Sequence, residues 1–446
     1  MLAAFDLAED SWIALEEDVK KTLLCALLMI LSRGFALGQA QYKVLWNFGG
    51  SGDGAEPLSN LIFDQAGNLY GTTGSGGSTN GGGTVFKLSP NEDGTWTEAI
   101  LYSFCPNTPC TDGFSPRAGL LLDKRGSLYG TTYSGGNQPC GFLTSGCGTV
   151  FKLSPFQGSS WKETVLYNFC SNNSNRECLD GALPVSQLTA DASGNLYSTT
   201  STGGTGGSGG GCCRGGTAFE LSRGQSGWTE TVLHNFCPNG PPICLDGVAP
   251  QAGVTFDKAG NLYGTTQSGG DPKSSGAGTV YKLSPSANGW TETVLLQDRY
   301  PFRNGGGPVG MVSFDTAGRL YTTLSGGGEF NSGGVVGLSP AGKHKLYWFN
   351  GKDGAAPMSG LLVDSKNGVL YGTTSAGGST GVDGGTVFEI TAPAQETVLY
   401  NFCSQPNCTD GVGVLTGVVK DVAGNLYGTT KLGGANGLGV VYEIIP

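Results

Sequence analysis

Aspartate is the residue type whose number and spacing in this chain could do chemistry. One series follows a short apolar run and precedes a Tyr by six residues, or by seven at Asp364: Asp64, Asp123, Asp191, Asp257, Asp315, Asp364 and Asp421. Pairs of carboxylates can act as general acid and general base. A catalytic centre is usually asymmetric, however, and seven equivalent copies are typical of a structural role. We therefore expect this Asp series to hold a repeat together, and the Tyr rings to pack between repeats.

A second aspartate series stands before glycine, and its members are Asp53, Asp112, Asp180, Asp246, Asp353 and Asp410. Such carboxylates could bind Ca²⁺, which takes Asp and backbone oxygens. No copy carries the several alternating acids that a calcium loop normally has. Asp that hydrogen-bonds nearby backbone N–H groups, beside a Gly with positive φ, explains the pattern more simply. We expect no cofactor, and structural calcium stays an open alternative.

One segment departs from the repeat more than any other, and it combines charged with aromatic residues. It reads LLQDRYPFRNGGGPVG over residues 295–310 and contains Asp298, Arg299, Tyr300 and Arg303. A charged, aromatic loop could bind a sugar or a peptide, and sequence drift is the competing interpretation. The sequence has no G-x-S-x-G or H-E-x-x-H motif and no phosphate-binding loop in a suitable context. We expect no catalytic residue and no metal ligand, and we take these four residues as the candidate ligand-binding site.

Twelve cysteines outside the N-terminal apolar run fall into six local pairs. Five are spaced: Cys105 and Cys110, Cys140 and Cys147, Cys170 and Cys178, Cys237 and Cys244, and Cys403 and Cys408. In an exported protein this pattern indicates small disulfide-closed loops. A zinc site needs four converging ligands, whereas each loop offers two. The adjacent Cys212 and Cys213 could form a strained disulfide, stay free or pair between molecules.

These residues are carried by a repeat whose marker is LYGTT or a close variant. The marker begins at Leu69, Leu128, Leu196, Leu262, Leu320, Leu370 and Leu426, at spacings of 50 to 68 residues. Each unit contains four short segments that suit β-strands, separated by turns rich in glycine. Examples of the four segments are residues 118–123, 68–73, 83–90 and 161–169. Such a unit is typical of a four-stranded propeller blade.

The two ends of the repeat array complete one another. Residues 42–48 form a lone fourth strand, and residues 440–446 form a third strand that lacks its fourth. Pairing them would close a ring and remove an exposed sheet edge. The sequence therefore predicts an all-β, seven-bladed β-propeller with four strands per blade, closed by the N-terminal strand.

Composition and the N-terminal segment bear on location and partners. Two lysines, an apolar run over residues 22–31 and the small residues Gly38 and Ala40 predict a signal peptide that is cleaved after Ala40. We therefore divide the chain into residues 1–40, an N-terminal extension with the signal peptide, and residues 41–446, the propeller. The net charge of −10 without a basic cluster argues against nucleic-acid binding. We expect a secreted, monomeric protein of the extracellular space or cell envelope, with no membrane span in the mature chain.

The motifs GNLYGTT, GTVFKLSP and ETVLYNF, recurring in this order, resemble the exported bacterial tandem-repeat family called GloVer, a choice-of-anchor repeat family. The D-x-x-G-N-L-Y turn is also similar to NHL and YVTN propeller repeats. The resemblance covers residues 42–446 and implies a repeat fold, an extracellular or surface location and no established activity. The chain ends at Pro446 without a sorting tail, which favours release over anchoring.

The sequence thus predicts a disulfide-braced binding or scaffold module whose partner is an unknown extracellular glycan or protein. One alternative is a carbohydrate-active enzyme, a polysaccharide lyase or glycoside hydrolase, with its acids at the axial face of the ring. Another is an adhesion or extracellular matrix protein. Two or more carboxylates together with an Arg or Tyr in one axial pocket would favour the enzyme.

Overall fold

The structure is a computed structural model. It describes residues 40–140, 146–174, 177–205, 215–225, 227–239, 244–271, 276–297, 307–339, 342–392 and 394–446. Three predictions fall outside these residues: the signal peptide, the Cys212 and Cys213 pair, and the candidate site at Asp298, Arg299, Tyr300 and Arg303.

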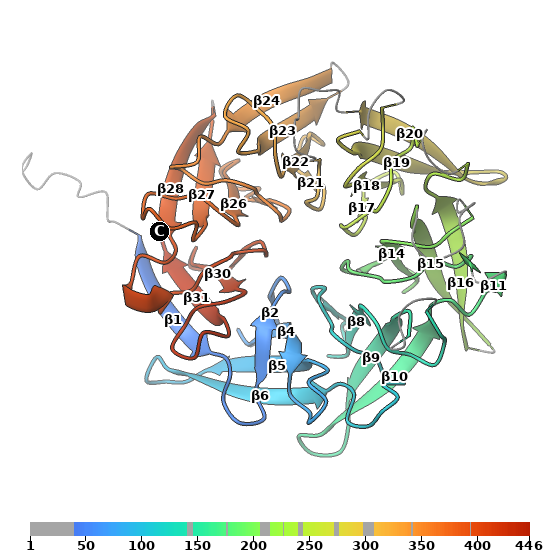
Figure 1. The fold of residues 1–446 in the computed structure, drawn as a ribbon, viewed down its shortest axis with the longest axis horizontal. Helices are drawn as coiled ribbons and strands as arrows, with labels where there is room; N and C mark the ends of the chain where they lie inside the picture. The colour runs from blue at the N-terminus through green and yellow to red at the C-terminus, as the bar shows by residue number, and fades with distance from the viewer. Residues whose placement is uncertain are drawn as a thin grey trace, which may run out of the picture. The chain divides into compact units, whose positions relative to one another are not determined.

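Residues Tyr42–Ile445 form one compact unit, a closed ring of seven four-stranded antiparallel sheets (Figure 1). The innermost strands are two residues long: β3 (Ile62–Phe63), β7 (Leu121–Leu122), β13 (Thr189–Ala190), β17 (Thr255–Phe256), β21 (Ser313–Phe314), β25 (Leu362–Val363) and β29 (Val419–Lys420). The second strands are β4 (Leu69–Gly76), β8 (Leu128–Thr132), β14 (Leu196–Thr200), β18 (Leu262–Thr266), β22 (Leu320–Leu324), β26 (Leu370–Thr374) and β30 (Leu426–Thr430).

The third strands are β5 (Thr84–Pro90), β9 (Thr149–Pro155), β15 (Thr217–Gly224), β19 (Thr279–Ser286), β23 (Gly334–Ser339), β27 (Thr386–Thr391) and β31 (Val440–Ile445). The outer strands are β6 (Trp96–Ser103), β10 (Trp161–Asn168), β16 (Gly227–Asn235), β20 (Gly289–Gln297), β24 (Gly342–Trp348), β28 (Gln395–Asn401) and β1 (Gln41–Asn47). Short pieces outside this scheme are β2 (Gly54–Pro57), β11 (Asn173–Ser174), β12 (Glu177–Cys178) and the 3-10 turn Pro406–Cys408.

The predicted ring closure is confirmed. The last sheet has the order β1-β31-β30-β29, so the N-terminal strand supplies the outer strand of the seventh blade. The Phe48 N–H donates to the Gly439 carbonyl at 3.0 Å, and the Ala435 N–H donates to Asn47 Oδ1 at 2.7 Å. The chain therefore forms the seven-bladed β-propeller that the repeat predicts.

The LYGTT motif is explained by packing inside each blade. A Cβ built on Gly71 would lie 2.6 Å from the ring of Phe86, its partner on the next strand, so a side chain there would crowd this ring. In the third blade Ser198 faces Phe219 at the same position, so a serine is accommodated beside the ring there. In the fifth blade Thr322 replaces this glycine, and its partner is the smaller Val336. A small residue is thus preferred where a ring faces this position, and the bulkier Thr322 coincides with the smaller Val336.

The Asp series and the Tyr series stabilise the blades, as expected. Asp64 accepts hydrogen bonds from the Ala66 and Asn68 N–H groups, both at 2.9 Å, and from the Tyr70 hydroxyl at 3.0 Å. Burial opposes its ionisation, but these donors and the Asn68 amide lower the pKa of Asp64. The Tyr hydroxyl bond recurs at Asp123, Asp191, Asp257, Asp315 and Asp421. These carboxylates are therefore engaged in turns.

The Tyr rings pack between blades. Tyr197 of the third blade lies edge-on to Phe256 of the fourth, with ring centroids 5.1 Å apart, and 6.4 Å from Trp290. Tyr427 of the seventh blade makes the same contacts with Phe63 and Trp96 of the first. The aromatic contacts therefore continue across the closure of the ring.

Candidate functional site

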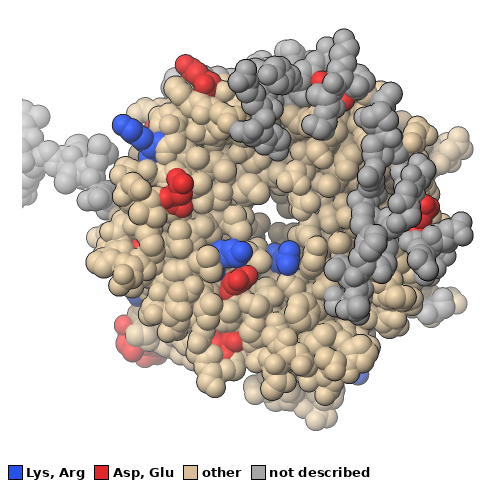
Figure 2. Space-filling view, in the orientation of Figure 1, with Lys and Arg blue, Asp and Glu red and all other residues tan. Residues whose placement is uncertain are grey.

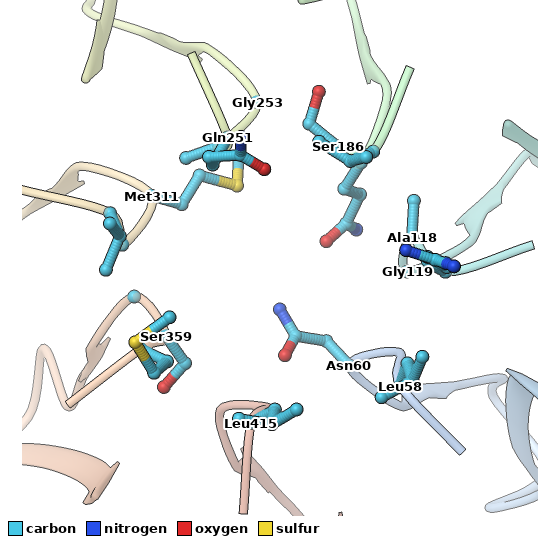
Figure 3. A pocket seen from close by; sticks show the side chains of 18 residues that line it. Leu58, Asn60, Ala118, Gly119, Ser186, Gln251, Gly253, Met311, Ser359 and Leu415 are labelled. Atoms are coloured by element: carbon cyan, nitrogen blue, oxygen red, sulfur yellow. The ribbon is translucent and has the colours of Figure 1, made fainter. Parts of the chain in front are cut away.

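Seven turns, one from each blade, surround the central axis just before the innermost strands. The residues that line the pocket there are Leu58, Asn60, Arg117, Ala118, Gly119, Val185, Ser186, Gln187, Gln251, Ala252, Gly253, Val309, Gly310, Met311, Met358, Ser359, Gly360 and Leu415. We call this set the axial mouth (Figure 3). Its cavity volume is about 120 Å³, enough for a small polar group but not for a whole sugar chain. The repeat fixes its position, and its side chains differ from blade to blade.

Two amide side chains of the axial mouth are held by neighbouring blades. Asn60 Oδ1 accepts the Gly417 N–H at 2.7 Å, and its amide nitrogen points into the pocket (Figure 3). Gln187 Nε2 donates to the Leu120 carbonyl at 3.1 Å. Each amide thus bonds another blade through one of its two polar atoms, and the other polar atom of Asn60 faces the pocket.

Arg117 is the one charged residue among those that line the axial mouth. Its guanidinium carbon lies 4.1 Å from the centre of the Tyr133 ring, and its Nε donates to Ser115 Oγ at 3.1 Å. Stacking on an aromatic face leaves the outer nitrogens of a guanidinium available for a carboxylate. Figure 2 shows a mostly uncharged face that is hollowed at its centre, with a few charged side chains beside the opening.

No lining residue of the axial mouth is Asp or Glu. The paired carboxylates that general acid–base cleavage of a glycoside requires are therefore missing from this set of residues. Among the described residues the pocket itself therefore lacks the carboxylates that would favour a carbohydrate-active enzyme, and Figure 2 shows an acidic side chain beside the opening, outside that set.

Below the axial mouth the channel is lined mainly by the innermost strands. This second cavity has a volume of about 430 Å³ and apolar side chains that include Ile62, Phe314 and Val419. The carbonyl just before an innermost strand accepts a hydrogen bond from a hydroxyl of the preceding blade. Thr189 Oγ1 donates to the Val254 carbonyl at 2.7 Å, and the same bond recurs from Thr255 and Ser313. These hydrogen bonds join neighbouring blades along the channel and satisfy carbonyls that lack a strand partner.

The Asp-Gly carboxylates lie at the outer junctions between blades. Asp112 Oδ2 accepts the Tyr102 hydroxyl at 2.9 Å and the Cys105 N–H at 3.0 Å. Similar bonds hold Asp180, Asp246, Asp353 and Asp410, with His234 in the place of Tyr at Asp246. The Asp oxygens therefore close local turns, which is the simpler of the two roles that the sequence left open.

A set of buried acids beside these Asp residues was not singled out from the sequence. They are Glu98, Glu163, Glu230, Glu292 and Glu396, one on each of five outer strands, and in each the Oε1 atom is buried without a hydrogen-bond partner. Burial raises the pKa of all five, and for all but Glu292 the Asp of the preceding junction is the next cause. The pKa values reach about 9 for Glu98 and about 8 for Glu230. In the sequence, the alternation of WTETVLY predicts that its Glu faces solvent. In the structure the loop of the preceding junction covers this Glu, and the sequence pattern does not place that loop.

The five spaced cysteine pairs form disulfides in the structure. They join Cys105 to Cys110, Cys140 to Cys147, Cys170 to Cys178, Cys237 to Cys244 and Cys403 to Cys408. Several disulfides in one chain are typical of proteins that work outside the cytosol. In the part of the chain that the structure describes, no helix has the length and apolar character needed to cross a membrane.

Fold and repeat together define the class of protein: a tandem-repeat, seven-bladed β-propeller braced by disulfides. The model of the Gloeobacter/Verrucomicrobia repeat matches residues 34–211, 180–382 and 272–446. The chain therefore belongs to this repeat family, as its motifs indicated. No curated protein matches its sequence.

Three solved structures are similar to the chain. A putative 6-phosphogluconolactonase from Bacteroides uniformis has a TM-score of 0.47 at 12% identity, over 76% of this chain and 83% of that one. A protein of unknown function from Dyadobacter fermentans has a TM-score of 0.42 at 12% identity, over 91% of this chain and 98% of that one. PorZ, a surface component of the type-IX secretion system of Porphyromonas gingivalis, has a TM-score of 0.39 at 14% identity, over 82% of this chain and 44% of that one. Because all three TM-scores lie below 0.5, we draw no functional conclusion from them.

Proposed function

We propose that the protein is an exported, non-catalytic binding module whose axial mouth takes the acidic end of an extracellular glycan. The observation that carries the proposal is the composition of the mouth: amides, hydroxyls and one guanidinium, with no carboxylate among its lining residues. Such a set can bind hydroxyls and a carboxylate but supplies no acid–base pair. The division into residues 1–40, removed on export, and residues 41–446 forms part of the proposal.

Rigidity of the mouth favours binding. Asn60 and Gln187 are held by hydrogen bonds to other blades, so a ligand does not have to order them. A group that enters the mouth meets Arg117 at the rim and amides below. The cavity of about 120 Å³ accommodates one carboxylate-sized group, and the rest of the ligand would lie across the outer face.

The test uses purified residues 41–446 on an array of neutral and acidic glycans, with reducing-end assays on the same polysaccharides. We expect binding to acidic glycans without cleavage. The R117M variant should lose at least tenfold in affinity, since a charge-assisted hydrogen bond contributes about 1.5–3 kcal/mol. Lys258 lies exposed in the β17–β18 hairpin outside the mouth, so K258M is the matched control and should bind like the wild type.

Three results would overturn the proposal. Release of reducing ends by the wild type, and not by R117M, would make the mouth catalytic. Binding that R117M leaves unchanged would move the site away from the mouth. A wild-type protein that binds no glycan on the array would exclude the glycan and point to a protein partner.

A further inference from the structure

Four cysteines from two loops of the second blade meet in one cluster. Cys140 and Cys147 lie in the loop between β8 and β9, and Cys170 and Cys178 follow β10. The Sγ atoms of Cys147, Cys170 and Cys178 all lie within 4.8 Å of one another, and Cys140 is bonded to Cys147. All four side chains are at most 3% exposed. In the sequence each loop offers two ligands, but the fold brings the two loops together.

The course of the backbone accounts for this meeting. The residue that precedes the Gly-Thr of the third strand is Cys147 in the second blade, and it is Gly82 in the first and Gly384 in the sixth. A Cβ built on Gly82 would lie 2.7 Å from the Cβ of Cys105, and one on Gly384 would lie 3.1 Å from that of Cys403. Any side chain at this position therefore faces the first cysteine of the loop after the outer strand.

One distance between sulfurs of the two disulfides matches the edge of a tetrahedral metal site. With a Zn–S distance of about 2.3 Å, the edge of a tetrahedron of thiolates is about 3.8 Å. The Sγ atoms of Cys147 and Cys178, which are not bonded to each other, are 3.8 Å apart. The Cys105 and Cys403 loops face glycine at the corresponding position, so each offers two sulfurs only.

We propose that Cys140, Cys147, Cys170 and Cys178 form a redox-convertible site that holds two disulfides when oxidised and one Zn²⁺ when reduced. Reduction by a dithiol transfers two electrons and two protons to each disulfide, giving four thiols and two oxidised dithiols. Zn²⁺ then binds the four sulfurs and releases their four protons. Oxidation by two two-electron oxidants restores the disulfides and expels the metal.

The test measures zinc in residues 41–446 after reduction with excess dithiol and Zn²⁺, followed by gel filtration and metal analysis of the folded peak. The C147G variant restores the glycine of the first and sixth blades, and it should carry one zinc fewer per chain than the wild type. The C105S/C110S double variant removes a disulfide that has no neighbouring pair, and its zinc content should equal that of the wild type. Oxidised wild type should carry no zinc at this site.

Cobalt gives a second readout, because four thiolates around Co²⁺ produce an intense charge-transfer absorption that C147G should abolish. Equal zinc contents in wild type and C147G would overturn the proposal. If dithiol alone unfolds the chain, adding Zn²⁺ should restore the folded peak for the wild type and not for C147G, since metal that binds only the folded state stabilises it. A wild type that stays unfolded in excess Zn²⁺ would also refute the site.

Discussion

Replacing Glu230 by Gln should make the protein more resistant to unfolding at alkaline pH. Glu230 lies on β16 with Oε1 buried and unpartnered. Burial, and then the nearby Asp180, raises its pKa to about 8. An acid with a raised pKa in the folded state contributes stability that is fully present below its unfolded value of 4.5. That contribution is lost as the pH rises toward 8.

The size of the effect follows from the shift. A rise from 4.5 to about 8 corresponds to about 5 kcal/mol at about 1.4 kcal/mol per pH unit. Solvent reaches part of the side chain, which reduces the expected value to roughly 2 kcal/mol. Glutamine is neutral at every pH and nearly the same shape. E230Q should therefore match the wild type near pH 4.5 and exceed its free energy of unfolding by about 2 kcal/mol at pH 9.

The assay is denaturant unfolding of the oxidised protein at pH 4.5, 7 and 9, followed by tryptophan fluorescence. E92Q, in the exposed turn between β5 and β6, is the matched control and should follow the wild-type curve at each pH. The reasoning fails if wild-type stability is the same at pH 4.5 and pH 9 with E230Q unchanged. It also fails if E230Q is the less stable protein at pH 9.

Three further substitutions test the packing of the blades by thermal unfolding. G130T should destabilise by about 1–3 kcal/mol, because a Cβ there lies 2.6 Å from the Phe151 ring, and G130T/F151V should recover most of the loss. Y70F removes the hydroxyl bond to Asp64 and should cost about 1 kcal/mol; no loss would mean that the bond contributes nothing. H234Y restores the Tyr of the other blades and should leave the melting temperature within a few degrees, while a large decrease would show that this imidazole is required.

The repeat made most of the fold predictable. LYGTT marks the second strand of every blade, and the half-blades at the two ends indicated the closure that β1 and β31 make. The structural role of Asp64 and its equivalents followed from their sevenfold recurrence. Each of these features depends on residues that are close in sequence or on a motif that recurs along the chain.

The axial mouth could not be predicted in the same way. Asn60 and Gly417 are 357 positions apart, and only the closed ring brings them into contact. The mouth segments do share a pattern, since six of the seven follow a Pro and each has a small residue in the middle. The side chains on either side of that small residue vary from blade to blade, so the pattern does not show that they meet at one pocket. Burial of Glu230 and convergence of Cys147 with Cys178 likewise depend on loops that a one-dimensional pattern does not place.

The strand that closes the ring has a consequence for the kinetics of unfolding. The bond from Ala435 to Asn47 joins residues 388 positions apart, and forming such a contact from an open chain costs about 5 kcal/mol in loop-closure entropy. That cost falls on a single event, the docking of β1 onto β31, whereas every other blade is made of strands adjacent in sequence. We therefore expect the ring to open first at the seventh blade. A pulling force or a protease that acts on residues 42–47 would detach β1 from β31. The first and sixth blades would then lose their packing contacts with the seventh.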